Sequence, residues 1–321
     1  MSNGAAFVHE SEDWDALLLI VADAVKRDVG LVEKDYWVTH ALWAIHHQGF
    51  EVWFKGGTSL SKGFGLIERF SEDIDARIDS GTTGLTDPKL SWNNKKGGVE
   101  ERRGWFDAVA QSMSVPACTI VRDPAGSDDL VRSAWFEVRY PPLHAEGLPP
   151  DMRPFVLLEV GRARVVPFVP RDLSSWVHDH LEAEGQLADY IDNRPRGVRC
   201  IHPWATCLEK LEAIARKFEQ DKPAPEFVRH YEDAARIIAA GASLPPLEDG
   251  LGALLAELAA KDHKVMPPSN HASFDATADT ERWRELQKAW ERIGPMYWGE
   301  RVPLLDACAT IRKFIDELGL V

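Results

Sequence analysis

Residues 55–79, KGGTSLSKGFGLIERFSEDIDARID, join a Gly-Gly-Thr turn, a short helix and an Asp-x-Asp strand in one unit. Gly56 and Gly57 lack a β-carbon, so the backbone can turn sharply there and come close to a ligand. Thr58 and Ser59 place hydroxyls where the first amides of a helix have no intrahelical partner, which suits a phosphate group. The turn therefore predicts a phosphate site, and the alternative interpretation is a capped helix start without a ligand.

Two carboxylates follow this turn on a predicted strand. Asp73 and Asp75 are two residues apart, so both side chains project from the same face. Mg²⁺ prefers such oxygen ligands and is commonly bound together with substrate phosphates. Ser71 lies on the same face if the strand begins early, where it would bind a phosphate or cap the turn after Phe70. The segment predicts metal-assisted chemistry on a nucleoside triphosphate; the alternative is a solvated edge strand.

Composition sets the outer bounds of the prediction. The chain has 321 residues and is 45% hydrophobic, which allows a sizeable core and two domains. It contains no apolar stretch of membrane-spanning length, no signal-peptide pattern at its start and only four scattered cysteines, so a cytoplasmic protein with free thiols is expected. The net charge of −14 disfavours extended contact with nucleic acid, and a small contact with one RNA end would be weakened less.

The order of predicted elements indicates an α+β domain followed by a mainly helical one, with the boundary near residue 170. The first part is predicted to contain helices at 12–28, 33–47 and 99–113, and strands at 51–55, 73–78, 117–122, 132–140, 154–160 and 163–168. Residues 79–98 are rich in turn formers and predict a long loop, made locally basic by Lys89, Lys95 and Lys96. The second part predicts a short strand at 197–201 and helices at 203–219, 226–240, 247–261, 278–292 and 303–318.

Several blocks of the sequence resemble the AbiEii-type nucleotidyltransferase toxins of abortive-infection and toxin–antitoxin systems, within the DNA polymerase β-like nucleotidyltransferase superfamily. The blocks are EKDYWV (33–38), VWFKGGTSLSKGFGLIERFSEDIDARI (52–78), FVLLEVG (155–161), EKLEAIARK (209–217) and RHYEDAAR (229–236). The resemblance implies a polymerase β-like catalytic domain, a mixed sheet with flanking helices, over residues 1–170. It further implies that the helical domain, residues 171–321, contributes to the nucleotide and acceptor cleft.

The resemblance also implies roles for residues outside the first unit. Glu159 would be the third carboxylate, completing the metal site with Asp73 and Asp75 and helping to deprotonate the attacking hydroxyl. Lys210 would bind the triphosphate, and Asp233 would face the same cleft. The alternatives are an outward-facing edge-strand residue for Glu159 and a solvated helix face for Lys210.

The function that the resemblance implies is a Mg²⁺-dependent toxin that transfers a nucleoside monophosphate from a nucleoside triphosphate to RNA. The candidate acceptor is the tRNA 3′ end, growth inhibition is the expected outcome, and a cognate antitoxin is the expected partner. Two alternatives stay open. One is transfer to a small-molecule or protein hydroxyl, since the acidic charge fits a cationic acceptor. The other is a nucleotide-binding protein that has lost catalysis and acts through a partner.

Overall fold

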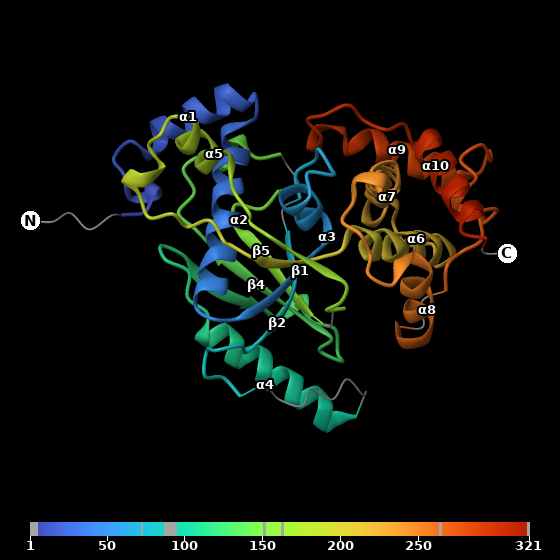
Figure 1. Cartoon of the computed structure of the whole chain (residues 1–321), viewed down its shortest axis with the longest axis horizontal. Coiled ribbons are helices and arrows are strands. Elements are labelled where there is room, and N and C mark those ends of the chain that lie inside the picture. The colour runs from blue at the N-terminus through green and yellow to red at the C-terminus, as the bar shows by residue number, and fades with distance from the viewer. Residues whose placement is uncertain are drawn as a thin grey trace, which may run out of the picture. The chain divides into compact units, whose positions relative to one another are not determined.

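The chain folds into two compact units in the computed structural model, which describes residues 6–71, 73–86, 95–149, 152–161, 164–262 and 265–319 (Figure 1). The first unit comprises Met1–Gly63 and Ser71–Cys200, and the second comprises Phe64–Phe70 and Ile201–Val321. The division falls after Cys200, later than the residue 170 predicted from the sequence. The short segment Phe64–Phe70 lies in sequence between the Gly-Gly turn and the Asp-x-Asp strand, yet it belongs to the second unit.

A mixed sheet forms the centre of the first unit (Figure 1). Within the described residues it has seven strands in the order β3-β4-β5-β2-β1-β7-β6. β1 pairs antiparallel with β2 and parallel with β7, β2 pairs parallel with β5, and β4 pairs antiparallel with both β3 and β5. The strands are β1 Glu51–Lys55, β2 Asp73–Asp79, β3 Thr119–Asp123, β4 Ser133–Arg139, β5 Val156–Gly161, β6 Phe168–Arg171 and β7 Val198–Ile201.

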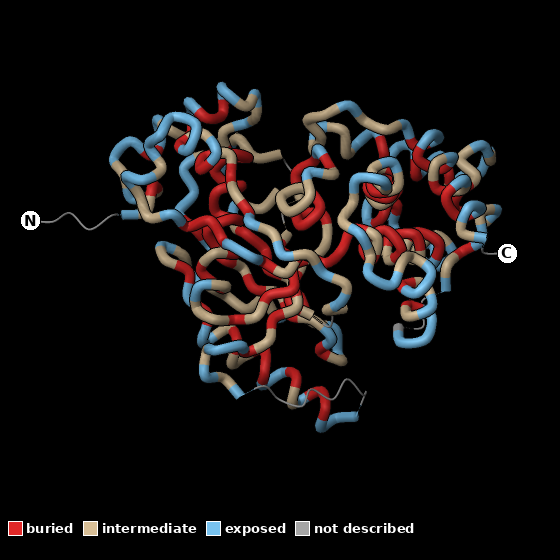
Figure 2. Tube along the Cα trace, viewed as in Figure 1, coloured by how far each residue is buried: buried red, intermediate tan, exposed pale blue. Residues whose placement is uncertain are grey.

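The two faces of the sheet differ in character, as β2 shows. Ile74, Ala76 and Ile78 are at most 2% exposed, whereas the alternate residues of the strand are partly exposed. This period of two follows from the pleat, which sends successive side chains to opposite faces. Burial of this apolar face stabilises the sheet, whereas the edge strands β3 and β6 contain no buried residue; Figure 2 shows the burial along the chain. The predicted mixed sheet with flanking helices is thus confirmed.

Helices surround this sheet and build the second unit. Those of the first unit are α1 Trp14–Val25, α2 Val29–His47, α3 Gly56–Thr58, α4 Lys96–Ser112 and α5 Trp176–Ala183; a π-helical turn, Ser59–Gly63, continues α3. Those of the second unit are α6 Pro203–Glu219, α7 Arg229–Ala239, α8 Gly250–Asp262, α9 Glu281–Arg292 and α10 Leu304–Glu317. The predicted helical C-terminal part is therefore confirmed.

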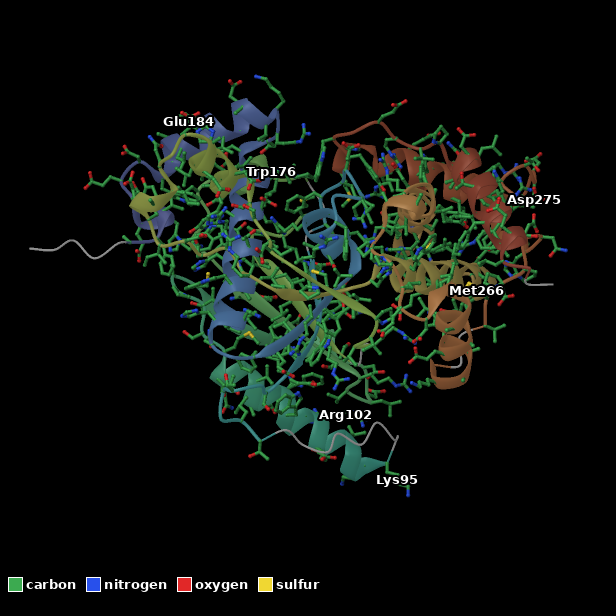
Figure 3. The ribbon with its side chains drawn as sticks, viewed as in Figure 1. Lys95, Arg102, Trp176, Glu184, Met266 and Asp275 are labelled. Atoms are coloured by element: carbon green, nitrogen blue, oxygen red, sulfur yellow. The ribbon has the colours of Figure 1, made fainter. Side chains whose placement is uncertain are left out.

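The charged residues of the EKDYWV run are buried on α2 and hold other segments of the first unit. The Glu33 carboxylate accepts hydrogen bonds from the backbone N–H groups of Leu143 and His144, both at 2.9 Å. Asp35 accepts one from the N–H of Trp176, labelled in Figure 3, at 3.0 Å. Buried carboxylates are costly unless they are paired in this way. This run, one of the five blocks that resemble the family, therefore holds segments of the first unit together.

Asp35 also anchors the turn that follows the Gly-Gly-Thr motif. Its carboxylate lies 2.5 Å from Lys62 Nζ, and the two side chains are only 9% and 10% exposed. We expect Asp35→Asn to lower the free energy of unfolding by about 3–5 kcal/mol, because Lys62 is left as a buried, uncompensated charge. Urea unfolding monitored by tryptophan fluorescence measures the change. Asp23→Asn is the control, since Asp23 forms an exposed pair with Lys26 and its loss should matter little.

Two predicted features differ from the structure or lie outside its described part. The strand predicted at 163–168 is found later, as β6, Phe168–Arg171. Lys89 lies outside the described residues, and Lys96 is the first residue of α4. Among the helices of the described chain, none is both long and apolar enough for a membrane span.

Candidate active site

The three predicted carboxylates lie on one face of neighbouring strands. Asp75 on β2 is the direct register partner of Glu159 on the parallel strand β5. On its other side, Asp75 pairs with Lys55 of β1. Asp73 precedes Asp75 by two positions on the same strand, so its side chain shares that face. The sheet therefore brings Asp73, Asp75 and Glu159 together, although Glu159 is more than 80 residues away in sequence.

The chemistry of these side chains fits a divalent metal ion. Carboxylate oxygens are the ligands that Mg²⁺ prefers, and Asp73, Asp75 and Glu159 supply them from adjacent strands. Within the residues that the structure describes, no group of three or more His, Cys, Asp and Glu side chains is gathered closely enough to hold a metal ion. The three carboxylates therefore share a face of the sheet but are not assembled as a metal site in the described part of the chain.

Gly56 connects the turn to these carboxylates. Its φ angle is +74°, a backbone conformation that residues with a β-carbon rarely adopt. A β-carbon built on Gly56 would lie 2.1 Å from Oδ2 of Asp75, well inside van der Waals contact. The backbone of the turn therefore lies directly against the Asp75 carboxylate, and the glycine is required by both the conformation and the close approach.

The hydroxyls of the turn are directed to the protein itself. Thr58 Oγ1 is the donor to the backbone carbonyls of Asp73, at 2.6 Å, and Ser71, at 3.0 Å. This contact ties α3 to the beginning of β2, and Thr58 is only 2% exposed. Ser59 is equally buried, and its Oγ has no hydrogen-bond partner among the described residues. Ser71 is the hydroxyl residue of this group that remains partly exposed.

Lys210 and Asp233 are brought together in the second unit. Lys210 Nζ on α6 lies 2.8 Å from Asp233 Oδ2 on α7. Asp233 is fully buried, and burial alone would raise its pKa. Arg69 and Lys210 nevertheless hold the pKa of Asp233 well below its usual value, so it is ionised. Burial lowers the pKa of Lys210, and the neighbouring Asp233 opposes that effect.

Arg69 is a member of this cluster that was not predicted from the sequence. Its guanidinium donates to both carboxylate oxygens of Asp233, from Nε at 2.9 Å and from Nη2 at 2.8 Å. Arg69 belongs to Phe64–Phe70, which we call the strap. The strap is bound to residues near 297 through Phe70 N–H to Met296 O, 2.9 Å, and Trp298 N–H to Glu68 O, 3.0 Å. The sequence offered one indication of this role, an arginine within a segment that also contains apolar residues. That pattern does not identify Asp233 as the partner of Arg69.

The predicted site residues thus fall into two groups. Gly56, Gly57, Thr58, Ser59, Ser71, Asp73, Asp75 and Glu159 belong to the first unit, and Lys210 and Asp233 belong to the second. Each group contains a direct contact between predicted residues. In the first, the Gly56 turn lies against Asp75, and in the second, a buried ion pair joins Lys210 to Asp233.

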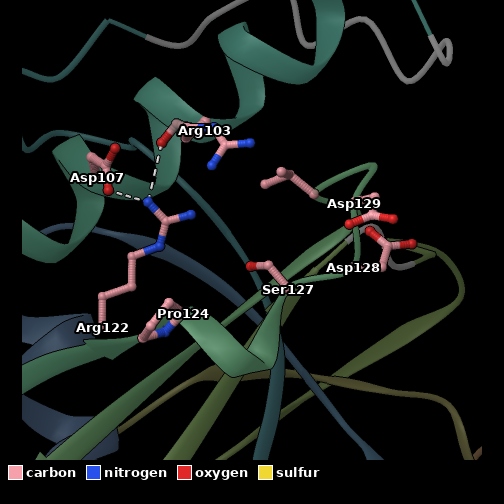
Figure 4. Close-up of a pocket in the computed structure, with 8 residues that line it drawn as sticks. Arg103, Asp107, Arg122, Pro124, Ser127, Asp128 and Asp129 are labelled. Atoms are coloured by element: carbon pink, nitrogen blue, oxygen red, sulfur yellow. Dashed lines mark hydrogen bonds and ion pairs between the residues drawn. The ribbon is translucent and has the colours of Figure 1, made fainter. Parts of the chain in front are cut away.

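A pocket of about 580 Å³ lies elsewhere in the first unit (Figure 4). Through the pairing of β3 with β4, β4 with β5 and β5 with β2, Arg122 lies in the same row of the sheet as Ile74. Its side chain is therefore on the sheet face opposite to that of Asp75. Arg122 bonds to the carboxylate of Asp107 and to the carbonyl of Arg103, as the dashed lines show. None of the predicted site residues is among those that line the pocket: Arg103, Asp107, Arg122, Pro124, Ser127, Asp128, Asp129 and Val131.

Comparison with known proteins assigns the chain to a class. Its fold is that of a nucleotidyltransferase: it matches MenT4, a nucleotidyltransferase toxin from Mycobacterium tuberculosis H37Rv, with a TM-score of 0.56 and 18% identity over 95% of this chain and 90% of that one. The family model for the nucleotidyl transferase AbiEii toxin of type IV toxin–antitoxin systems matches residues 41–308. A search of curated proteins found no significant match. The chain therefore belongs to the AbiEii family and is a nucleotidyltransferase toxin, which confirms the resemblance seen in the sequence.

Proposed function

We propose that this toxin transfers a nucleoside monophosphate from a nucleoside triphosphate to an RNA acceptor in a Mg²⁺-dependent reaction, with the tRNA 3′ end as the candidate target. The observation that carries the proposal is the register of Asp75 with Glu159, which sets three carboxylates on one face beside the Gly56 turn. Membership of a nucleotidyltransferase toxin family supports the same reaction class. Modification of an RNA needed for translation would inhibit growth.

The carboxylates would carry the chemistry of the transfer. Asp73, Asp75 and Glu159 would hold Mg²⁺, which when bound neutralises phosphate charge and activates the attacking oxygen. The acceptor hydroxyl attacks the α-phosphorus, a new O–P bond forms, and the bond to the β-phosphate oxygen breaks, so pyrophosphate leaves. Glu159 would assist removal of the hydroxyl proton. Apart from this proton transfer, the protein mainly positions the reactants, as in other phosphoryl-type transfers.

Nucleotide binding would use the residues that the sequence and the family resemblance predict. The backbone of Gly56 and Gly57 and the hydroxyl of Ser71 would contact the phosphates, while Thr58 and Ser59 hold the turn in shape. Lys210 would neutralise triphosphate charge. Asp233 is fully buried and paired, so we assign it the role of positioning Lys210. In this proposal residues 1–170 form the catalytic domain, and residues 171–321 contribute to nucleotide and acceptor binding.

The partners follow from the family and from the reaction. A type IV toxin is expected to have a cognate antitoxin. Nucleoside triphosphates and tRNA are cytoplasmic molecules, so the proposed activity would be cytoplasmic.

One observation favours a second class of acceptor. The net charge of −14 attracts a cationic small molecule, or a hydroxyl group on a basic protein, more readily than it attracts RNA. Retention of the three-carboxylate set argues against a nucleotide-binding protein without catalysis.

A transfer assay distinguishes these acceptors. We expect label from one or more α-phosphate-radiolabelled nucleoside triphosphates to enter total tRNA when they are incubated with the purified protein and Mg²⁺. Gel analysis of the RNA, with and without prior removal of its 3′-terminal nucleotides, would locate the added nucleotide. Label that appears instead in a protein or small molecule would replace RNA as the acceptor. The absence of label in every acceptor, with nucleotide binding intact, would favour the binding-only alternative.

A further inference from the structure

The buried cluster around Asp233 contains more positive than negative charge. Arg69 and Lys210 share the single carboxylate of Asp233, and the three residues are 2%, 8% and 0% exposed. The nearest further partner of Lys210 Nζ is His230 Nδ1, at 3.4 Å. Burial holds the pKa of His230 well below its usual value, so the imidazole is neutral and adds no charge. Within the described residues, this cluster therefore carries a net charge of about +1.

A neighbouring cluster on the same helix shows how unusual this imbalance is. Glu232 is also fully buried and binds two arginines, Arg236 at 3.0 Å and Arg301 at 3.0 Å. There, however, Arg236 has a second acidic neighbour, Glu68, at 3.6 Å. Two guanidinium groups thus face two carboxylates, and the charges balance. Among the direct ion pairs of the Asp233 cluster within the described chain there is no second carboxylate, and Glu232 acts on the Arg69 guanidinium only through its charge.

Uncompensated buried charge is costly, and a bound anion relieves that cost. If Asp233 were paired with Lys210 alone, the pair would be neutral and would offer little attraction to phosphate. Arg69 changes this, because its guanidinium occupies both oxygens of Asp233 in bidentate geometry. Because Arg69 already offsets the charge of Asp233, the positive charge of the Lys210 ammonium is not cancelled and can attract a polyanion. Arg229 adds to the positive potential, since its charge also disfavours the protonated form of Lys210.

The strap holds Arg69 in place independently of the ion pair. Arg69 forms a backbone bridge with Tyr297, and the following residue, Phe70, donates its N–H to Met296 O at 2.9 Å. Arg69 is therefore presented to Asp233 by two separate sets of contacts. A guanidinium fixed in this way can offset the carboxylate without itself moving toward a ligand.

We propose that Arg69 is a positioning residue for nucleoside triphosphate binding: it offsets the charge of Asp233 and so leaves the Lys210 ammonium available to the triphosphate. The proposal rests on the role of Lys210 under the proposed function. If Arg69 acts by offsetting the charge of Asp233, removal of both charges should have a different effect on binding from removal of Arg69 alone. A purely structural role for Arg69 predicts no such recovery. Loss of Arg69 weakens nucleotide binding, and additional loss of the Asp233 charge restores it.

The experiment measures dissociation constants by equilibrium dialysis with the radiolabelled nucleoside triphosphates and Mg²⁺, and uses inorganic tripolyphosphate as a base-independent competitor. We expect Arg69→Gln to weaken binding by about 10- to 100-fold, as for loss of a charge-assisted contact. Arg69→Gln combined with Asp233→Asn is expected to bind triphosphate more tightly than Arg69→Gln alone, because the amide oxygen of the substituted side chain still accepts a hydrogen bond from Lys210 but carries no charge. Arg69→Lys keeps the charge and should bind triphosphate well even if its melting temperature falls.

Arg301→Gln is the matched control, because it removes an arginine from the buried Glu232 while Arg236 remains. It should lower the melting temperature without changing triphosphate affinity. Normal affinity in folded Arg69→Gln, or no recovery in the folded double variant, would overturn the charge-balance role. Lys210→Ala separates this result from the underlying function. If Lys210→Ala binds triphosphate normally, the proposed nucleotide site itself is wrong; if only Lys210→Ala loses binding, the inference about Arg69 alone fails.

Discussion

Asp73→Asn is expected to abolish nucleotidyl transfer while the protein remains folded. Asp73 lies at the start of β2, on the same sheet face as Asp75 and Glu159. The substitution keeps the size of the side chain but removes the negative charge that a divalent metal requires from its ligand. We expect kcat to fall by about 1,000-fold or more, since metal-assisted charge stabilisation contributes several kcal/mol to such reactions. The transfer assay with radiolabelled nucleotide measures the loss, and circular dichroism checks the fold.

Asp79→Asn provides the control for this experiment. Asp79 lies on the same strand and face, but its carboxylate is paired with Arg77 at 2.8 Å and it is no proposed metal ligand. The two variants therefore make the same chemical change six residues apart on one strand. We expect Asp79→Asn to keep most of the transfer activity. Full activity in a folded Asp73→Asn protein would remove Asp73 from the metal site.

Local patterns predicted the elements that form the site. The strand at 51–55 and the helix at 203–219 have the predicted bounds, and β2 extends only one residue further than predicted. These elements have strong apolar periodicity and clear boundaries, such as Gly56 after β1 and Pro203 at the start of α6. The shared face of Asp73 and Asp75 follows from the strand period alone. The pairing with Glu159 required the family resemblance, because parallel register is set by contacts that are distant in sequence.

Other features depend on long-range contacts that no local pattern specifies. β7 pairs with β1, so the sheet continues beyond residue 170. The strap belongs to the second unit through backbone bonds to residues near 297. The Arg69–Asp233 pair joins positions 164 residues apart, and nothing in either segment identifies the other. The Thr58 hydroxyl suits a phosphate by its position in the sequence, but the fold supplies backbone carbonyls as acceptors.

Gly56→Ala is expected to cause a large loss of activity through the Asp75 carboxylate. The added β-carbon would lie 2.1 Å from Asp75 Oδ2, so either the carboxylate or the turn has to move. A displacement of about 1 Å at a reacting centre can reduce the rate by about 100-fold, and we expect a loss of that size in kcat/KM. The φ angle of +74° adds backbone strain, which we expect to lower the free energy of unfolding by about 1–2 kcal/mol.

Gly197→Ala separates the two effects of this substitution. Gly197 has a similar φ angle of +64°, but a β-carbon there would meet nothing within 4 Å. We therefore expect the control variant to show the loss of stability and to keep its transfer activity. Measuring kcat/KM and urea unfolding for both variants distinguishes strain from displacement of the carboxylate. If Gly56→Ala were as active as Gly197→Ala, close contact between the turn and Asp75 would have no part in catalysis, and the phosphate-binding role of the turn would need another basis.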